Sequence, residues 1–283
     1  MNNIKYFIQF LLIIILLIIY KILGLKISNF LSGIVFSFIG PFFRSKDISH
    51  QNLINAFPNI DIHKRNKILK KMWFNYGKIF SEYLFIKEIK NSNKIVVENQ
   101  HILDAVKNSG EPVIFISGHF NNFELMAMHI ERSGIDLAAI YRPLNNIFLN
   151  PIMEKIRKTH ICKKQIKKGI SGTKEILKNF KNGTSVALMI DQRVSEGIKS
   201  KFFNKDAFTT TIPAQFVKKF GTPIVPIYIE RKIDDSFQLV VCEPIKYQKS
   251  EDLETITSDL NKVLEKMIVR NPEQWIWTHN RWK

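Results

Sequence analysis

The chain has 283 residues, of which 45% are hydrophobic and 24% charged, with 12 glycines and 10 prolines. This composition is that of a globular protein with ample core material, so it excludes a disordered chain and a collagen-like repeat, and two cysteines exclude a disulfide scaffold and a cysteine-rich zinc site. Forty-two Lys and Arg against 25 Asp and Glu leave a formal net charge of +17, which favours an anionic partner: nucleic acid, anionic lipid or an acidic carrier protein.

A long apolar segment opens the chain. From Tyr6 to Tyr20 only Gln9 is strongly polar, and the residues that follow Tyr20 do not form the small-residue cleavage site of a signal peptide. With Lys21 snorkelling, the run reaches the roughly 20 apolar residues that a membrane span requires. A buried core helix is the alternative, but the dense Ile/Leu block favours a membrane-anchor helix over residues 1–26.

Basic residues on the C-terminal side of this segment set its expected orientation; they are Lys21, Lys26, Arg44 and Lys46. By the positive-inside bias that side faces the cytoplasm, so residues 27–283 are expected to form a single cytoplasmic domain whose N-terminal part is membrane-associated. The stretch from Ile27 to Phe43, interrupted by polar residues and glycines, is more typical of an interfacial or core-packed helix than of a second span. The +17 charge then fits adhesion to an anionic leaflet, where each surface Lys or Arg contributes on the order of 1 kcal/mol.

Beyond Pro58 the chain alternates between helical and strand patterns. Helices are expected at 61–90, 101–108, 122–132, 147–159, 173–181, 214–220 and 253–269. Strands are expected at 112–117, 137–141, 185–190 and 223–229, with 237–241 pairing antiparallel to the last of them. This alternation predicts an α/β fold with a mixed, mostly parallel sheet flanked by helices.

The segment from Ser117 to Glu124 follows a predicted buried strand, and sites of doubly wound sheets form at the carboxyl ends of strands. Gly118 permits a tight turn, after which His119 stands at the mouth of the next helix. Glu124 lies about 1.4 turns into that helix, from where its carboxylate can reach one imidazole nitrogen and stabilise the imidazolium. A base without its own nucleophile points to activation of a substrate hydroxyl. A structural histidine is an equal alternative, and no HExxH pattern or nearby third ligand supports a metal.

The sequence GHFNNFE resembles the His-x4-acidic motif of the glycerolipid acyltransferases, and in detail that of the branch that acylates lipid A, the late lauroyl and myristoyl acyltransferases. Further stretches match that branch in order: Tyr141-Arg142-Pro143, Asp191-Gln192, Phe202-Phe203, Thr209 to Thr211, Gly221 to Ile227, and the ending from Pro272 to Lys283. The resemblance runs from the N-terminal anchor to the last residue. It implies a glycerolipid-acyltransferase-like fold, and nothing in it points to a cofactor or a metal.

The resemblance also implies a mechanism. His119, assisted by Glu124, would deprotonate a hydroxyl of a Kdo-bearing, phosphorylated lipid A precursor, and the oxygen would attack an acyl thioester on acyl carrier protein. The oxyanion needs a donor, and Arg142 is the candidate for that role or for gripping a phosphate, with a plain surface arginine as the alternative.

Two further stretches of the chain supply candidate residues whose roles the sequence leaves open. Asp191 follows a strand and is expected either to orient Arg142 or an acceptor hydroxyl, or to serve a structural turn. Thr209 and Thr210, with Thr211, precede a helix that opens near Pro213. Their hydroxyls either bind phosphate or cap this helix.

The expected partners are an acyl carrier protein, a phosphorylated glycolipid and anionic membrane lipid, with no nucleic acid. The expected location is the cytoplasmic face of the inner membrane of a Gram-negative bacterium. The alternatives are a related acyltransferase acting on another glycolipid or a lysophospholipid, and a non-catalytic, basic, membrane-tethered binding protein. For Trp275, Trp277 and Trp282, core packing is favoured over a place at the membrane interface.

Overall fold

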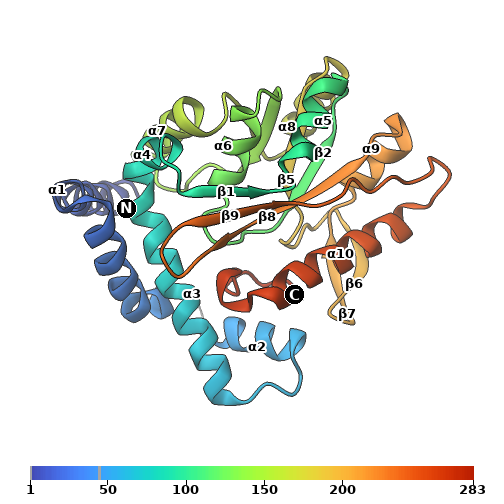
Figure 1. Ribbon diagram of the computed structural model, residues 1–283. Coiled ribbons are helices and arrows are strands. Elements are labelled where there is room, and N and C mark those ends of the chain that lie inside the picture. Colours follow the sequence, from blue (N-terminus) through green and yellow to red (C-terminus); the bar gives the residue numbers. More distant parts are fainter. Residues whose placement is uncertain (1, 44–45) are drawn as a thin grey trace.

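The computed structural model describes residues 2–43 and 46–283 and contains a seven-stranded sheet with helices on both faces (Figure 1). The strands are β1 (Ile95–Glu98), β2 (Ile114–Ser117), β3 (Leu137–Tyr141), β4 (Lys164–Lys167), β5 (Ser185–Met189), β8 (Ile224–Arg231) and β9 (Phe237–Val241). Their order is β1-β9-β8-β2-β5-β3-β4. Every neighbouring pair is parallel except β8 and β9. The predicted mixed, mostly parallel sheet is confirmed, including the antiparallel pairing of residues 237–241.

Helices precede the first strand, separate most of the sheet strands and follow the last strand. They are α2 (Lys46–Ala56), α3 (Ile62–Glu82), α4 (Ile86–Lys90), α5 (Gln100–Ser109), α6 (Glu124–Arg132), α7 (Asn150–Ile156), α8 (Ile170–Lys181), α9 (Ile212–Phe220) and α10 (Leu253–Arg270). Aspartates cap two of the longest: Asp61 accepts from the Lys64 amide at 2.8 Å and Asp252 from the Thr255 amide at 2.7 Å. The predicted helices have counterparts whose ends differ by up to three residues, except that the helix predicted at 61–90 is divided into α3, a 3-10 turn at Tyr83–Phe85 and α4.

Elements that the sequence pattern did not indicate are short or strongly polar. They are α2, the strands β1 and β4, and a hairpin of β6 (Ile198–Phe202) and β7 (Lys205–Thr209). β4 reads KQIK and forms the sheet edge, where lysines are common because they discourage pairing with other chains. At the other extreme, every residue of β2 and β8 is buried, which explains their continuous apolar runs.

The C-terminal tryptophans belong to the protein interior. Trp275 and Trp277 are 1% and 0% exposed, and their rings meet edge to face with centroids 4.6 Å apart. Trp282 is half-buried and its indole donates to the Phe202 carbonyl at 3.1 Å. The expectation of core packing is confirmed.

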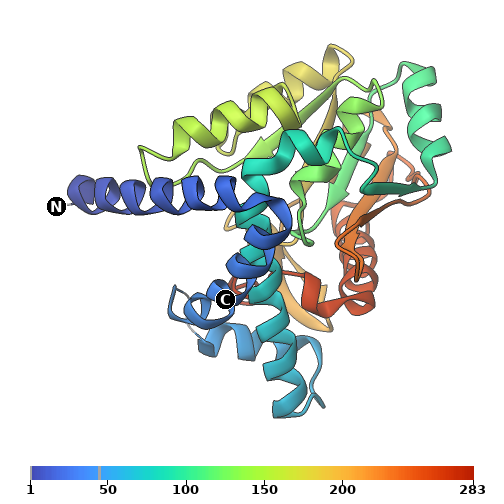
Figure 2. The same cartoon turned by 60° about the vertical axis from the view of Figure 1, so that its left-hand side comes forward.

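The first helix, α1 (Asn2–Phe43), is two helices joined at Gly24, whose φ of 76° and ψ of 167° are not helical. Residues 2–23, here called the anchor half, project from the body of the molecule, as Figure 2 shows, with side chains such as Ile4, Leu12 and Ile22 exposed. Among the described residues α1 is the one helix long and apolar enough to cross a membrane, with a mean hydropathy of 2.7 over its most apolar window. Arg44, part of the predicted basic flank, lies outside the described residues.

Residues 25–43, here called the docked half, pack against α3. A glycine permits the contact, since a Cβ on Gly77 would lie 2.2 Å from the Ser32 carbonyl oxygen. The Ser32 hydroxyl donates to the Gly77 carbonyl at 2.6 Å. The outer face of the docked half stays exposed, with Phe30 and Phe38 on it. This arrangement, one face packed and one face apolar and exposed, agrees with the interfacial or core-packed helix expected for residues 27–43.

Candidate active site

The site is built where the carboxyl ends of β2 and β5 meet. These strands are parallel neighbours with Ser117 opposite Met189, so the residues that follow both strands emerge side by side. The His119 backbone amide donates to Asp191 Oδ2 at 2.7 Å, and His119 Nδ1 lies 2.8 Å from Asp191 Oδ1. A carboxylate only accepts, so Nδ1 carries the proton and Nε2 is left as the basic nitrogen.

Asp191 is held by the protein interior. It is 1% exposed, and the Trp275 indole donates to its Oδ2 at 2.9 Å. An isolated carboxylate so deeply buried would be unstable, but here three donors satisfy its two oxygens. Because Asp191 is itself held in place, its hydrogen bond to Nδ1 fixes the orientation of the imidazole ring.

The partner of the ring therefore differs from the one expected from the His-x4-acidic spacing. Glu124 lines the same cavity, but its Oε1 accepts from Arg157 Nε at 2.8 Å, from Arg157 Nη2 at 2.5 Å and from the Tyr83 hydroxyl at 2.6 Å. Glu124 begins α6, and its side chain is turned to these two residues rather than to a ring nitrogen. Asp191, predicted as an orienting or structural residue, orients His119 and not Arg142.

The pair raises the basicity of His119. Burial alone would lower the pKa of the imidazole, but the charge of Asp191 and its hydrogen bond outweigh that effect, with a further contribution from the charge of Glu124, so the pKa lies above its usual 6.5. Asp191 shows the reverse balance: burial raises its pKa, while the charge and hydrogen bonds of His119 bring the pKa below its usual value. Both shifts favour an imidazolium beside a carboxylate.

Gly118 serves close packing rather than an unusual backbone angle. A Cβ there would lie 3.0 Å from Leu264 Cδ1 and from Phe120 Cε2, and 3.2 Å from Asp191 Oδ2. On the cavity side, the Phe123 ring meets the His119 ring edge to face with centroids 4.8 Å apart. His119 Nε2 lies 3.5 Å from the side-chain nitrogen of Gln192. Within residues 2–43 and 46–283, this long approach is the polar contact that the structure shows for the basic nitrogen.

A cavity of about 350 Å³ adjoins the pair. Its polar lining includes His119, Glu124, Arg142, Arg157, Lys168 and Gln192. Its apolar lining includes Ala139 and Ala187, which are opposite each other in β3 and β5, and Phe115, which is opposite Ala187 in β2. Ala139 and Ala187 are only half-buried although β5 is a central strand. The space left by these small side chains makes an apolar chamber beside the basic nitrogen.

The remaining candidates divide between the cavity and the interior. Arg142 is exposed and lines the cavity, as does Thr210, whose hydroxyl also accepts from the Ile212 amide at 3.3 Å. Thr209 is buried and its hydroxyl is occupied: it donates to the Ala207 carbonyl and accepts from Arg281 Nη2 at 2.7 Å. Of the two predicted threonines, the structure brings only Thr210 to the cavity.

Four residues of the site were not singled out from the sequence: Arg157, Tyr83, Trp275 as a donor to Asp191, and Gln192 as a neighbour of His119. Gln192 directly follows Asp191, so its signal was present. Arg157 lies in a π-helical turn, Arg157–Ile161, and its guanidinium reaches Glu124 from a segment that carries no motif. Among the described residues, no group of three or more His, Cys, Asp or Glu side chains is arranged to hold a metal ion.

Comparison with known proteins decides the family. The family model described as bacterial lipid A biosynthesis acyltransferase matches residues 1–283. The chain belongs to this family. It is 27% identical over 257 residues to a lipid A biosynthesis lauroyltransferase of Escherichia coli K12, a match that covers 85% of this chain and 79% of that one.

Two further proteins similar to this chain also carry names of lipid A acyltransferases. A lipid A biosynthesis palmitoleoyltransferase of Escherichia coli K12 is 24% identical, with 85% of this chain and 79% of the relative covered. A lipid A biosynthesis acyltransferase of Haemophilus influenzae is 23% identical, with 89% and 81% covered. The fold, the N-terminal apolar helix and the family together establish an acyltransferase of lipid A biosynthesis.

Proposed function

We propose that this acyltransferase moves a fatty acyl chain from acyl carrier protein to a hydroxyl of a Kdo-bearing lipid A precursor, with His119 as the general base. The observation that carries the proposal is the Asp191-bound imidazole, whose basic nitrogen lies beside the cavity. The hydrogen bonds of the His119 ring in the described part of the chain are to Asp191 and Gln192 and not to a serine, threonine or cysteine, which suits direct attack by the acceptor on a thioester.

One imidazole serves both proton movements of the transfer. His119 Nε2 takes the proton of the acceptor hydroxyl while the oxygen forms a bond to the thioester carbonyl carbon. The C–S bond then breaks, and the departing thiolate receives the proton from the imidazolium. Asp191 stabilises the imidazolium between these two events, and the charge of Glu124 adds to this stabilisation.

The negative charge that develops on the thioester carbonyl oxygen needs a hydrogen-bond donor. The phosphates of the acceptor need donors as well. The Gln192 amide, 3.5 Å from His119 Nε2, is placed to donate to a developing oxyanion. Arg142 and Lys168 are exposed at the cavity lining and suit acceptor phosphates, and Thr210 offers a hydroxyl on the same lining. Arg157 holds Glu124 in a partly buried ion pair and so shapes the wall behind the base.

The acyl chain is assigned to the apolar chamber between β2, β3 and β5. Ala187 lies four residues before Asp191, about 13 Å along the strand from the reacting centre. Its substitution by leucine is expected to fill the far part of the chamber and to shift donor preference toward shorter chains. Ala187→Gly should shift it toward longer ones. Mass spectrometry of products from mixed acyl donors measures both, and an unchanged product ratio in the leucine variant at normal total rate would contradict the assignment.

The membrane-facing side is proposed to be the surface that includes α1. The anchor half contacts the loop after β3: Phe7 packs edge to face on Phe148 with centroids 5.4 Å apart, and Asn146 Nδ2 donates to the Tyr6 carbonyl at 2.8 Å. Exposed Leu144 and Ile147 extend the apolar surface beside it. With the anchor half in the membrane, this loop and Arg142 at its start lie near the headgroups, which fits an acceptor lipid on the cytoplasmic face of the inner membrane.

The proposal is tested with purified full-length protein, acyl carrier protein loaded with lauroyl or myristoyl chains, and a tetra-acylated Kdo-lipid A precursor. Mass spectrometry is expected to show one added acyl chain, with matched acyl-CoA as a second donor to define donor choice. No product with any donor on this acceptor, while a lysophospholipid or another glycolipid is acylated, would contradict the proposed substrate.

A further inference from the structure

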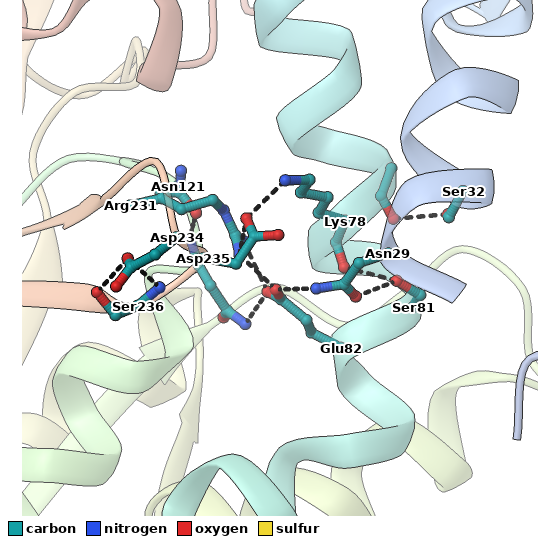
Figure 3. A network of polar contacts seen from close by, with 12 residues as sticks. Asn29, Ser32, Lys78, Ser81, Glu82, Asn121, Arg231, Asp234, Asp235 and Ser236 are labelled. Atoms are coloured by element: carbon teal, nitrogen blue, oxygen red, sulfur yellow. Dashed lines mark hydrogen bonds and ion pairs between the residues drawn. The ribbon is translucent and has the colours of Figure 1, made fainter. Parts of the chain in front are cut away.

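A buried carboxylate outside the cavity joins the anchor to the catalytic turn. Glu82, the last residue of α3, is 1% exposed and its two oxygens accept four hydrogen bonds (Figure 3). Arg231 Nη1 and Nη2, at the end of β8, donate at 2.6 and 2.9 Å. Asn29 donates to Oε1 and Asn122 to Oε2, both at 2.9 Å.

Each of the two amides comes from a functionally distinct segment. Asn29 belongs to the docked half of α1, and its side-chain oxygen Oδ1 accepts from the Ser81 hydroxyl at 2.8 Å. Asn122 lies three residues after His119 and directly before Phe123, whose ring packs on the imidazole. Both asparagines are buried, so neither contact is shared with bulk water. One carboxylate therefore connects the docked helix with the turn that carries the base.

The turn at residues 118–123 is irregular and depends on such contacts. Asn121 has a φ of 39°, in the left-handed region, which a non-glycine residue adopts only when its surroundings hold it there. The Asn121 amide donates to the Gln274 carbonyl at 2.7 Å, and its side-chain nitrogen donates to Gln274 Oε1 at 3.1 Å. Asp191 holds the turn at His119, Gln274 holds it at Asn121, and Glu82 holds it at Asn122.

Stability alone does not require this arrangement. Apolar residues of similar size stabilise a core about as well as a buried ion pair does, whereas directional hydrogen bonds, such as the four that Glu82 accepts, favour one geometry of the groups that they join. The geometry fixed here is that of the Asn122–Phe123 segment, and Phe123 is the aromatic wall against which the His119 ring rests.

We propose that Glu82 is a positioning residue for the acyl transfer: through Asn122 it sets the His119 turn, and through Asn29 it makes that setting depend on the docked half of α1. The inference rests on the proposed role of His119. Without the Asn122 contact, Phe123 is held less firmly against the His119 ring, whose remaining support is Asp191. Without the Asn29 contact, the carboxylate is no longer joined to the helix that carries the anchor.

The test uses single substitutions in the full-length protein with the acyl-transfer assay described above. Asn122→Ala is expected to lower kcat by about ten- to a hundredfold, and Asn29→Ala by about three- to tenfold, with KM for donor and acceptor within about twofold. Ser32→Ala is the matched control, because Ser32 lies on the same helix and bonds to α3 but not to Glu82. It is expected to keep kcat. Glu82→Gln removes the shorter of the two ion pairs of Arg231 and leaves the one with Asp235 Oδ1 at 3.7 Å, so it serves only as a supporting variant.

Hydrogen exchange of the amides in residues 118–123 supplies a readout that does not depend on activity. It is expected to rise in the Asn122 and Asn29 variants and to stay unchanged in Ser32→Ala. Unchanged kcat in folded Asn122→Ala and Asn29→Ala overturns the inference, and so does an equal loss in Ser32→Ala, which would reflect general undocking of the helix. If exchange rises as expected but His119→Ala keeps its activity, the failure lies in the proposed function and not in the coupling.

Discussion

Replacement of His119 by alanine is expected to lower kcat for acyl transfer by about a thousandfold, within the range that a general base typically contributes. The reason is that Nε2 is the basic nitrogen beside the cavity, and within the described residues its recorded polar neighbour is the Gln192 amide, which cannot accept a proton at neutral pH. KM for the acceptor is expected to change little, because the phosphate-binding candidates Arg142 and Lys168 remain. The measurement is steady-state kinetics by mass spectrometry.

Two further variants separate chemistry from folding in that experiment. His119→Ala leaves the buried Asp191 without its ring partner, so part of its effect could come from instability. His119→Gln keeps a donor for Asp191 but offers no base, and it should be as inactive while unfolding at nearly the wild-type temperature. The exposed His101 provides the control: His101→Ala should retain full activity. More than about a tenth of wild-type kcat in His119→Ala would refute the base role.

Asp191→Asn is expected to lower kcat by about a hundredfold or more and to move the acid limb of the pH profile to lower pH. In the wild-type enzyme the pKa of His119 lies above its usual value, because the charge and hydrogen bond of Asp191 outweigh burial. A general base works only when neutral, so activity falls as the pH drops through that raised pKa. Without the carboxylate charge, burial prevails and the pKa of His119 falls.

The loss in Asp191→Asn should therefore be largest at high pH and smallest at low pH, where the wild-type imidazole is already protonated. A pH–rate profile for kcat from about pH 5 to about pH 9 measures this. Asp136→Asn serves as control, since that carboxylate pairs with Lys164 at 2.6 Å on the surface, away from the cavity lining. An acid limb that stays in place in Asp191→Asn would show that another group governs the profile.

Local patterns are sufficient to predict the sheet and the position of His119, the proposed base. The apolar run before Gly118 and the strand-turn-helix pattern after it placed His119 at the carboxyl end of β2, where it is found. The carboxylate partner could not be read in the same way. Spacing along a helix pointed to Glu124, but the position of Asp191 depends on β5 being the neighbour of β2, which is a property of strand order and not of either segment.

The Glu82 network could not be predicted from the sequence for the same reason. Asn29, Asn122 and Arg231 lie 53, 40 and 149 residues from Glu82 along the chain. Asn122 falls within the GHFNNFE motif, but nothing in that motif indicates a contact with Glu82. A polar residue within an apolar helix, such as Asn29, was interpreted as an interruption of a membrane-spanning pattern. Its partner became visible only through the packing of the docked half on α3, which the glycines make possible.

The bend at Gly24 has a consequence for how the enzyme meets its two substrates. Because the docked half is fastened to α3 while the anchor half leaves at an angle, the cavity is held at a set height and tilt above the bilayer in which the anchor is proposed to lie. With the proposed substrates, the acceptor would reach the site by lateral diffusion within the leaflet, whereas the acyl carrier protein would arrive from bulk solution. In vesicles, the rate should follow the surface mole fraction of acceptor, and dilution of the whole vesicle suspension at constant mole fraction should leave it unchanged for membrane-bound enzyme.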